Sequence, residues 1–296
     1  MIDLFHPIMI SMSLNRIKFI AVLLACFFQA DTIFAQLLFP QKPGVVSYTY
    51  RKYFEKDVPS TLDMIKANGF TDIEFSNLFG KTAAELRALI DERGLKCSSF
   101  GVSYEDFINK TAQVAQNAKT LGADYVRVAG IPHKGVFTPE EAQQAIDDFN
   151  STGKLLKEQY GLSFVYHNHG FEFEPYKTGT LFDLLVEQTD RKYVSFELDI
   201  LWAFFPGQDP AKLLDKYPGR FKLMHLKDLK KGIKGNLSGG TSGDNDVALG
   251  AGQMDIPAIL KAAKKAGIQH YYIEDESNNI MEQVPASIAY LKTLTM

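Results

Sequence analysis

The sequence predicts an α/β protein built as a single (β/α)8 TIM barrel. Eight short β-rich runs alternate with longer helical patterns, which is the order typical of parallel βα units. The stretch from residue 36 to residue 296 is close in length to the ~250 residues that such a barrel usually contains. A composition with 46% hydrophobic and 23% charged residues indicates one folded domain with a large core and excludes disorder as the main state.

Residues 1–35 are predicted to be a secretory signal peptide that precedes the barrel. Arg16 and Lys18 come before an apolar run over residues 19–28, and a polar patch then leads to Ala35, after which cleavage is expected. The apolar run is too short to cross a bilayer of ~30 Å as a helix. Two alternatives stay open, a buried N-terminal helix and lipoprotein processing at Cys26. We therefore expect export to the periplasm and a single catalytic domain over residues 36–296.

Each predicted strand is a short run rich in β-branched and aromatic residues. In chain order the eight strands are Val45–Tyr48, Asp72–Phe75, Lys96–Phe100, Tyr125–Ala129, Phe164–His167, Val194–Asp199, Phe221–Leu226 and Tyr271–Glu274.

Cys97 is the one cysteine after residue 35. No internal disulfide is therefore expected, and the core must supply the stability.

The predicted helices carry apolar residues at helical spacing, most clearly at Leu86, Leu89 and Ile90. The alternative fold, an open doubly wound sheet, lacks the G-x-G-x-x-G turn after its first strand. Five helices are followed by a glycine suited to the left-handed position that ends a helix, namely Gly69, Gly94, Gly122, Gly161 and Gly267. The helices are Ser60–Ala67, Ala83–Arg93, Tyr104–Leu121, Pro139–Tyr160, Leu181–Gln188, Ala211–Tyr217, Pro257–Ala266 and Pro285–Leu294.

Residues 232–252, after the seventh strand, form a glycine-rich segment with seven glycines. The segment has no G-K-[ST] sequence, so it is not a phosphate-binding P-loop. Two interpretations stay open, a flexible excursion and a mobile lid over the mouth of the barrel.

Histidines and carboxylates gather where the predicted strands end, and catalytic groups of such a barrel lie at the carboxyl ends of its strands. The successive ends of strands five to eight read Tyr166-His167-Asn168-His169, Glu197-Leu198-Asp199, His225-Leu226-Lys227 and Ile273-Glu274. They offer His, Asp, His and Glu around one half of the mouth. This mixed set suits Mn²⁺, Zn²⁺, Co²⁺ or Fe²⁺ better than Ca²⁺, so one divalent metal ion is expected as cofactor.

These motifs resemble those of the xylose-isomerase-like sugar isomerase/epimerase superfamily, which includes inosose dehydratases, ketose 3-epimerases, and keto-glycoside lyases and hydratases. The resemblance covers essentially all of residues 36–296 and extends to the Leu249-Gly250-Ala251-Gly252 sequence. It implies that Asp199, His225 and Glu274 bind one divalent ion. His167 stands where the family usually has a ligating Glu, so His167 is the expected fourth ligand, with Glu172 and His169 as alternatives.

The resemblance also implies a reaction that removes a proton from the carbon next to a carbonyl. Glu274 or Glu172 would act as the base, and Lys227 and His169 would protonate a leaving group or orient hydroxyls. Lys227 has a structural alternative, an ion pair with Asp228 or Glu197. The candidates for substrate binding are Trp202, Glu74, Arg51 and Glu197.

The sequence therefore predicts a metal-dependent sugar isomerase/epimerase that acts by enolisation. Export favours an unphosphorylated sugar or keto-sugar, because sugar phosphates are cytoplasmic. One alternative is a metal-dependent lyase or hydratase that eliminates a β substituent from 3-keto-glycosides or inosose-like substrates. Another is a non-catalytic periplasmic sugar-binding protein.

The expected partner is a small molecule. A net charge of −3, from 32 Lys and Arg against 35 Asp and Glu, argues against a nucleic-acid partner and an endonuclease role. No membrane span is expected, and the sequence is compatible with a homo-oligomer without deciding it.

Overall fold

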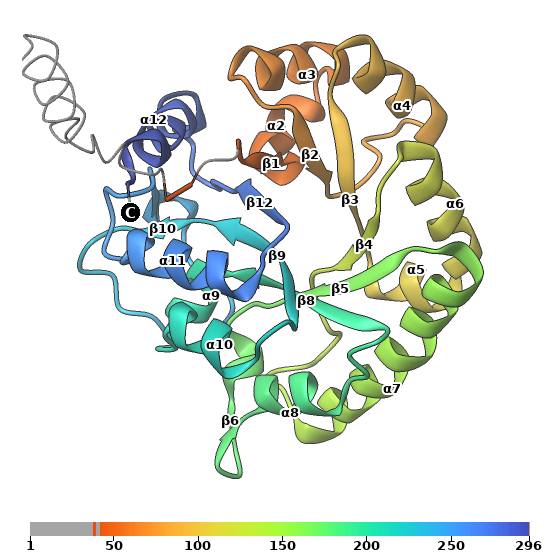
Figure 1. Cartoon of the computed structure of the whole chain (residues 1–296), viewed down its shortest axis with the longest axis vertical. Helices are drawn as coiled ribbons and strands as arrows, with labels where there is room; N and C mark the ends of the chain where they lie inside the picture. Colours follow the sequence, from red (N-terminus) through yellow and green to blue (C-terminus); the bar gives the residue numbers. More distant parts are fainter. Residues whose placement is uncertain (1–37, 40–41, 296) are drawn as a thin grey trace, which may run out of the picture. The chain divides into compact units, whose positions relative to one another are not determined.

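Eight parallel strands close into a barrel in the computed structural model, which describes residues 38–39 and 42–295. Around the barrel the strands follow one another as β1, β2, β3, β4, β5, β8, β9 and β12, and β12 pairs with β1. Figure 1 shows them inside a ring of helices. Their bounds are β1 Gly44–Val46, β2 Asp72–Phe75, β3 Lys96–Val102, β4 Tyr125–Val128, β5 Ser163–His167, β8 Val194–Asp199, β9 Phe221–Leu226 and β12 His270–Ile273.

Most of the helices begin at a residue whose side chain caps the helix. Thr82 and Glu85 form a reciprocal capping box at the start of α4, and Thr138 and Glu141 form another at α7. The helices are α2 Arg51–Phe54, α3 Val58–Ala67, α4 Ala83–Glu92, α5 Tyr104–Asn109, α6 Thr111–Leu121, α7 Pro139–Leu155, α8 Leu181–Gln188, α9 Ile200–Phe204, α10 Pro210–Lys216, α11 Ile256–Ala266 and α12 Ile280–Thr293.

The apolar core lies between the strands and the helices outside them. Phe164 of β5 stacks on Phe107 of α5 at 4.3 Å between ring centroids and packs against Phe149 of α7 at 5.0 Å. All three rings are buried, and each buried Phe contributes about 1.5–3 kcal/mol. Inside the barrel, by contrast, the buried residues Glu74, Arg127 and Glu197 are charged, so the barrel interior is where function is to be sought.

The predicted (β/α)8 barrel is confirmed, and the open doubly wound sheet is wrong because β12 and β1 pair in register, with Val45 opposite Ile273. The strands β2, β8 and β9 have the predicted bounds. The five predicted helix-ending glycines all have a positive φ, between 61° at Gly94 and 86° at Gly69. Glycine adopts this conformation without the steric cost of a Cβ, which is why it ends these helices.

Several elements differ in their bounds from the sequence prediction, and two differ in kind. The first strand ends at Val46, and Ser47–Tyr50 form a short 3-10 helix, where the Ser47 hydroxyl accepts a hydrogen bond from the Ser76 backbone N–H. The helix predicted over 104–121 is two helices, α5 and α6. Lys110 between them has φ −128° and ψ 31°, outside the helical region, so the α-helical hydrogen-bond ladder is interrupted there.

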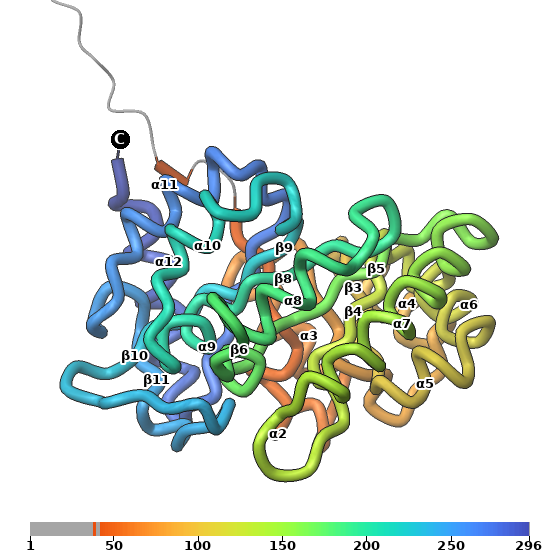
Figure 2. Tube along the Cα trace, turned by 90° about the horizontal axis from the view of Figure 1, so that it is seen from below, coloured from red at the N-terminus to blue at the C-terminus, as the bar shows by residue number. Residues whose placement is uncertain are grey.

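The glycine-rich segment is anchored by the carboxylate of Asp228. This carboxylate accepts hydrogen bonds from the backbone N–H groups of Leu229, Gly250, Gly252 and Met254, at 2.9–3.2 Å. A side chain at Gly252 would collide with the Asp228 carboxylate, which explains the glycine. β10 (Asp228–Leu229), just before the segment, pairs antiparallel with β11 (Asp246–Val247) inside it. Figure 2 shows β10 and β11 toward the same edge of the molecule as α2, which follows β1.

The predicted signal peptide and Cys26 lie outside the described residues, so cleavage after Ala35 stays a prediction, as does the domain boundary there. Within residues 38–39 and 42–295, no helix combines the length and the hydropathy that crossing a lipid bilayer requires.

We predict that Asp228→Asn lowers the free energy of unfolding by about 2–3 kcal/mol, because an amide NH₂ would then face backbone N–H donors that lose their acceptor. Chemical denaturation would measure this loss. Asp255→Ala is the control, since Asp255 caps only α11 and its removal should cost about 1 kcal/mol. An Asp228→Asn protein as stable as the wild type would contradict the anchoring role.

Candidate active site

A cavity of about 380 Å³ opens where the barrel strands end. Five residues predicted for the site line it, namely His167, His169, Trp202, His225 and Glu274. The backbone of Gly239 and Gly240 in the glycine-rich segment also lines the cavity. The segment therefore forms part of the cavity wall, as the lid interpretation requires.

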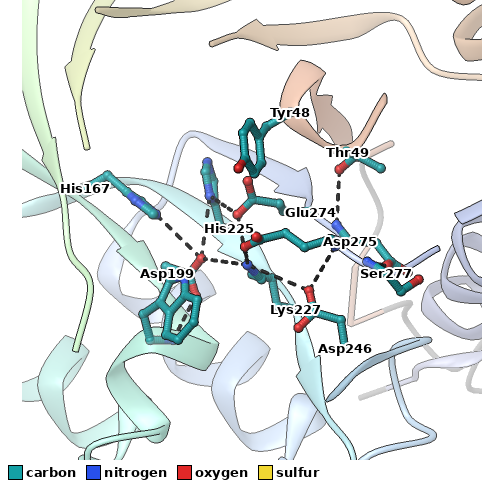
Figure 3. A network of polar contacts seen from close by, with 12 residues as sticks. Tyr48, Thr49, His167, Asp199, His225, Lys227, Asp246, Glu274, Asp275 and Ser277 are labelled. Carbon is teal, nitrogen blue, oxygen red and sulfur yellow. Dashed lines mark hydrogen bonds and ion pairs between the residues drawn. The ribbon is translucent and has the colours of Figure 1, made fainter. Parts of the chain in front are cut away.

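Three of the cavity residues form a cluster of metal-ligating type with Asp199, and these are the four residues that the sequence predicted. His167, Asp199, His225 and Glu274 each offer one ligand atom, and these atoms all lie within 4.8 Å of one another. Figure 3 shows the four side chains converging from separate strand ends. Neither ring nitrogen of His167 has a hydrogen-bond partner, and burial lowers its pKa well below the usual value, which keeps the imidazole neutral with a lone pair available.

The two carboxylate oxygens of Asp199 have different surroundings. Oδ1 accepts a hydrogen bond of 2.9 Å from the Trp202 backbone N–H and so caps α9. Oδ2 has no hydrogen-bond partner and lies 3.5 Å from His167 Nε2 and 3.7 Å from His225 Nδ1. The Asn168 side chain fixes this strand end through a bond of 3.0 Å from the Asp199 N–H to Asn168 Oδ1. The helix cap thus leaves one oxygen aimed into the cluster.

His225 lies between two pairs of carboxylates. Its Nε2 is 2.8 Å from Glu74 Oε1 and 3.2 Å from Glu197 Oε2, and its Nδ1 is 3.1 Å from Glu274 Oε2. Burial opposes protonation, but the carboxylates of Glu197, Glu274 and Glu74 outweigh it and raise the pKa of His225 well above the usual value. Nε2 thus faces Glu74 and Glu197, and Nδ1 faces Asp199 and Glu274 of the cluster.

Glu74 and Glu197, predicted to bind substrate hydroxyls, do not reach the cavity. Both are fully buried in the barrel, where Arg127 Nε lies 2.8 Å from Glu74 Oε1 and 3.5 Å from Glu197 Oε2. The prediction is corrected to a positioning role, because these carboxylates orient His225 and are neutralised by Arg127. Burial, followed by the charge of Glu74, raises the pKa of Glu197 to about 7.

Glu274 and Lys227 form a buried ion pair beside the cluster. Lys227 Nζ is 3.3 Å from Glu274 Oε2 and 2.5 Å from Glu276 Oε1, and it lies 3.8 Å from Asp246 Oδ2. Burial works against both charges, but the charges of Lys227 and His225 hold the pKa of Glu274 well below its usual range, and the carboxylates raise that of Lys227. As an alternative to a catalytic role, the sequence allowed an ion pair of Lys227 with Asp228 or Glu197. In the structure Lys227 pairs instead with Glu274 and Glu276.

Sequence reasoning did not identify Glu276, Asp246, Arg127 or Tyr48, which all belong to this region. Glu276 and Arg127 line the cavity, and Asp246 accepts a hydrogen bond from the Glu276 N–H. Burial raises the pKa of Asp246 to about 7, although Lys227 opposes the shift. The signal for Glu276 was available in the sequence, since Glu276 follows Glu274 by two residues at the same strand end.

His169 and Trp202, predicted separately as a catalytic and a substrate-binding residue, form an aromatic wall of the cavity. Their rings stack with centroids 5.9 Å apart at 30°, and Lys227 Nζ lies 5.1 Å from the Trp202 centroid. Burial lowers the pKa of His169 to about 4, so its ring is neutral, and its Nδ1 has no hydrogen-bond partner. The wall offers an apolar face beside a polar nitrogen.

Glu172 lies behind His169 and not in the cavity. Its buried carboxylate accepts hydrogen bonds from the Tyr166 hydroxyl at 2.5 Å and from the His169 backbone N–H at 2.9 Å. Glu172 is also not among the residues that form the four-residue cluster. The expectation that Glu172 acts as base or ligand is therefore corrected, because its carboxylate is held in the wall by the loop that carries His169.

Arg51 also lies outside this cavity. Its guanidinium donates hydrogen bonds to the backbone oxygens of Tyr48 and Glu276 and lies 4.3 Å from the centroid of the Tyr48 ring. Arg51 is therefore not placed to bind hydroxyls in this cavity, as was predicted, and it lies at the neighbouring surface instead.

Residues 62–294 match the family described as xylose isomerase-like TIM barrel. The chain belongs to this family. The match begins in α3 and ends beyond α12, so it contains all four residues of the metal-type cluster.

Among its relatives is an inosose dehydratase of Geobacillus thermodenitrificans, 31% identical over 248 residues, which cover 74% of this chain and 80% of the relative. An inosose dehydratase of Bacillus anthracis is 28% identical over 185 residues, 56% of this chain. The match spans 61% of the length of that relative. Both of these relatives are named as enzymes.

Solved structures of the same fold include a sugar phosphate isomerase/epimerase from Parabacteroides distasonis, with 26% identity and a TM-score of 0.70 over 84% of this chain and 93% of the other. The IolI protein with a bound zinc atom has a TM-score of 0.67 at 17% identity, over 85% of this chain and 95% of the other.

We predict that Glu172→Gln changes the pH dependence of stability. Burial raises the pKa of Glu172 to about 7, above the value of the unfolded chain, so its contribution to stability is present at acid pH and lost as the pH rises through about 7. The free energy of unfolding of the variant, relative to the wild type, should increase by about 2–3 kcal/mol from pH 5 to pH 8.

Denaturant unfolding at a series of pH values checks this. Glu105→Gln, on the exposed side of α5, controls for the substitution itself. A difference between variant and wild type that is the same at pH 5 and pH 8 would show that Glu172 is ionised throughout.

Proposed function

We propose that this protein is a metal-dependent sugar isomerase/epimerase that removes a proton from the carbon next to the carbonyl of a keto-sugar. The observation that carries the proposal is the cluster of His167, Asp199, His225 and Glu274, three of which line the cavity, with Lys227 beside it. A buried base and a set of unpaired ligand atoms in one sugar-sized cavity are what enolisation needs.

The four residues fit a divalent metal ion. His167 Nε2 and Asp199 Oδ2 are buried without a hydrogen-bond partner, a costly arrangement that a bound cation would relieve. Two imidazoles with two carboxylates suit Mn²⁺, Zn²⁺, Co²⁺ or Fe²⁺, and the zinc atom of the related IolI structure supports the same type of site. When bound, such an ion supplies Lewis acidity toward the carbonyl and hydroxyl oxygens of a substrate.

Glu274 is the base of the proposed reaction. Its pKa is held low by Lys227 and His225, so the carboxylate is ionised and ready to accept a proton at neutral pH. It is 8% exposed and lines the cavity, whereas the other carboxylates around His225 are closed off. Glu274 therefore faces the substrate while its partners hold it in place.

A second candidate, β-elimination, is favoured by the pair formed by Lys227 and Glu276. Glu276 lines the cavity, and its carboxylate oxygen lies 2.5 Å from Lys227 Nζ. Lys227 is thus a proton donor next to Glu274, the proposed base. A leaving hydroxyl or alkoxide needs such a donor. The inosose dehydratases among the relatives have names that describe a loss of water.

We further propose that the substrate is unphosphorylated and that the protein acts after export. Among the described residues that line the cavity there is one arginine and no lysine, and that arginine, Arg127, is already paired with Glu74. A phosphate site would need cations or helix N-termini that are free to bind it. The signal peptide predicted over residues 1–35 supports the location.

We predict that the metal-loaded protein catalyses exchange of a substrate C–H for deuterium in D₂O, followed by NMR over a panel of ketoses and 3-keto-glycosides. Glu274→Gln should slow the exchange by about 10²–10⁴-fold, because it removes the base. Glu282→Gln, exposed on α12, is the control.

Exchange without bond cleavage indicates epimerisation or isomerisation, and release of water or an aglycone indicates elimination. Binding of sugars without exchange would instead support the sugar-binding protein and contradict the proposed enzyme.

We predict that Glu74→Gln weakens binding of Zn²⁺ and Mn²⁺ by about 10–100-fold, because Glu74 orients His225 through Nε2. Competition with a chromogenic chelator measures the affinity without reference to activity. Glu92→Gln, exposed at the end of α4, should bind the ions as the wild type does. Unchanged affinity in Glu74→Gln would rule out the positioning role.

A further inference from the structure

Two hollows adjoin the cavity beside the ends of β1, β2 and β3. The outer hollow, of about 640 Å³, is lined by Tyr48, Arg51, Phe54, Glu55, Asn77 and Phe79. A second hollow of about 430 Å³ shares four residues with the cavity, including Ser76 and Gly101, and shares Asn77 with the outer hollow. Tyr48 lines both the cavity and the outer hollow, and Figure 3 shows its side chain next to Glu274. Each of the three spaces therefore shares at least one lining residue with each of the others.

The outer hollow combines aromatic faces with planar polar groups. Phe79 stacks on Phe54 with ring centroids 4.2 Å apart at 13°, and Tyr48 is 40% exposed. Two N–H groups of the Arg51 guanidinium bind backbone oxygens, and a guanidinium carries five such donors. Aromatic rings pack against the C–H faces of sugars, while Arg, Glu and Asn side chains bind hydroxyls. This chemistry suits a pyranose ring better than a purely apolar ligand.

The backbone at Phe79 supports a functional role for this hollow. Phe79 has a φ of 49°, a left-handed conformation that costs a bulky residue about 1–3 kcal/mol. Such strain persists where the surrounding structure holds it, and it is most common at binding sites. At this position the strained turn is what places the Phe79 ring over Phe54 at the edge of the hollow.

We propose that the outer hollow binds a second sugar ring, glycosidically joined to the ring that reacts in the cavity. The proposal rests on the proposed function for the inner ring. Tyr48 stands between the two spaces, so the glycosidic bond would pass along its ring, and Arg51 would bind hydroxyls of the outer sugar. The substrate is accordingly a glycoside of at least two rings, and a free monosaccharide would fill only the cavity.

Binding of unreactive sugars tests this without relying on catalysis. Matched one-ring and two-ring methyl glycosides of the gluco, galacto and xylo series, such as methyl β-glucoside and methyl β-cellobioside, are titrated into the metal-loaded full chain by calorimetry. In at least one series we expect the two-ring probe to bind about tenfold tighter or more. This advantage should shrink to near unity in Arg51→Ala and in Asn77→Ala.

Lys192→Ala is the matched control, because Lys192 also lies over a tyrosine ring, Tyr193, but precedes β8 at the other end of the barrel. Thermal unfolding of each variant checks that it is folded. Equal affinity for one-ring and two-ring probes, or an advantage that survives in both variants, overturns the second-ring site. Tighter binding of phenyl β-glucoside but not of cellobioside also overturns it, in favour of an aromatic aglycone. None of these outcomes bears on deuterium exchange, so a failure of the proposed function is seen separately.

Discussion

The site depends on the position of His225 between two pairs of carboxylates. Its two ring nitrogens face different surroundings, with Glu74 and Glu197 on one side and Asp199 and Glu274 on the other. In a buried environment a hydrogen bond at Nε2 fixes the orientation of the ring and decides which nitrogen is offered to the cavity. The barrel makes this arrangement by bringing β2, β8, β9 and the end of β12 around one interior point.

Charge balance explains why so many ionisable groups are tolerated there. Arg127 offsets Glu74 and Glu197 inside the barrel, and Lys227 offsets Glu274 and Glu276 at the mouth. Buried carboxylates without such partners would take up protons and lose their function. The excess of carboxylates over cations that remains near Asp199 favours a divalent ion, whereas Glu274 is kept ionised by the charges of Lys227 and His225.

Much of this architecture was predictable from local patterns. The strands β2, β8 and β9 follow from their β-rich runs, and the glycines that end five helices follow from the need for a positive φ. The four residues of the metal-type cluster were predictable because a barrel places its strand ends together. The break at Lys110 was not, since the apolar spacing of a helix continues across it and only the backbone angles reveal it.

The sequence by itself determined the barrel, the cluster of His167, Asp199, His225 and Glu274, and the family. Only the tertiary structure decided which carboxylates face the cavity. Glu74, Glu172 and Glu197 were site candidates beside Glu274, yet Glu74 and Glu197 hold His225, and Glu172 holds the His169 loop. The physical reason is that a strand or loop places a side chain near an end of the barrel, while packing against residues distant in sequence fixes whether it points inward, into the wall or toward the substrate.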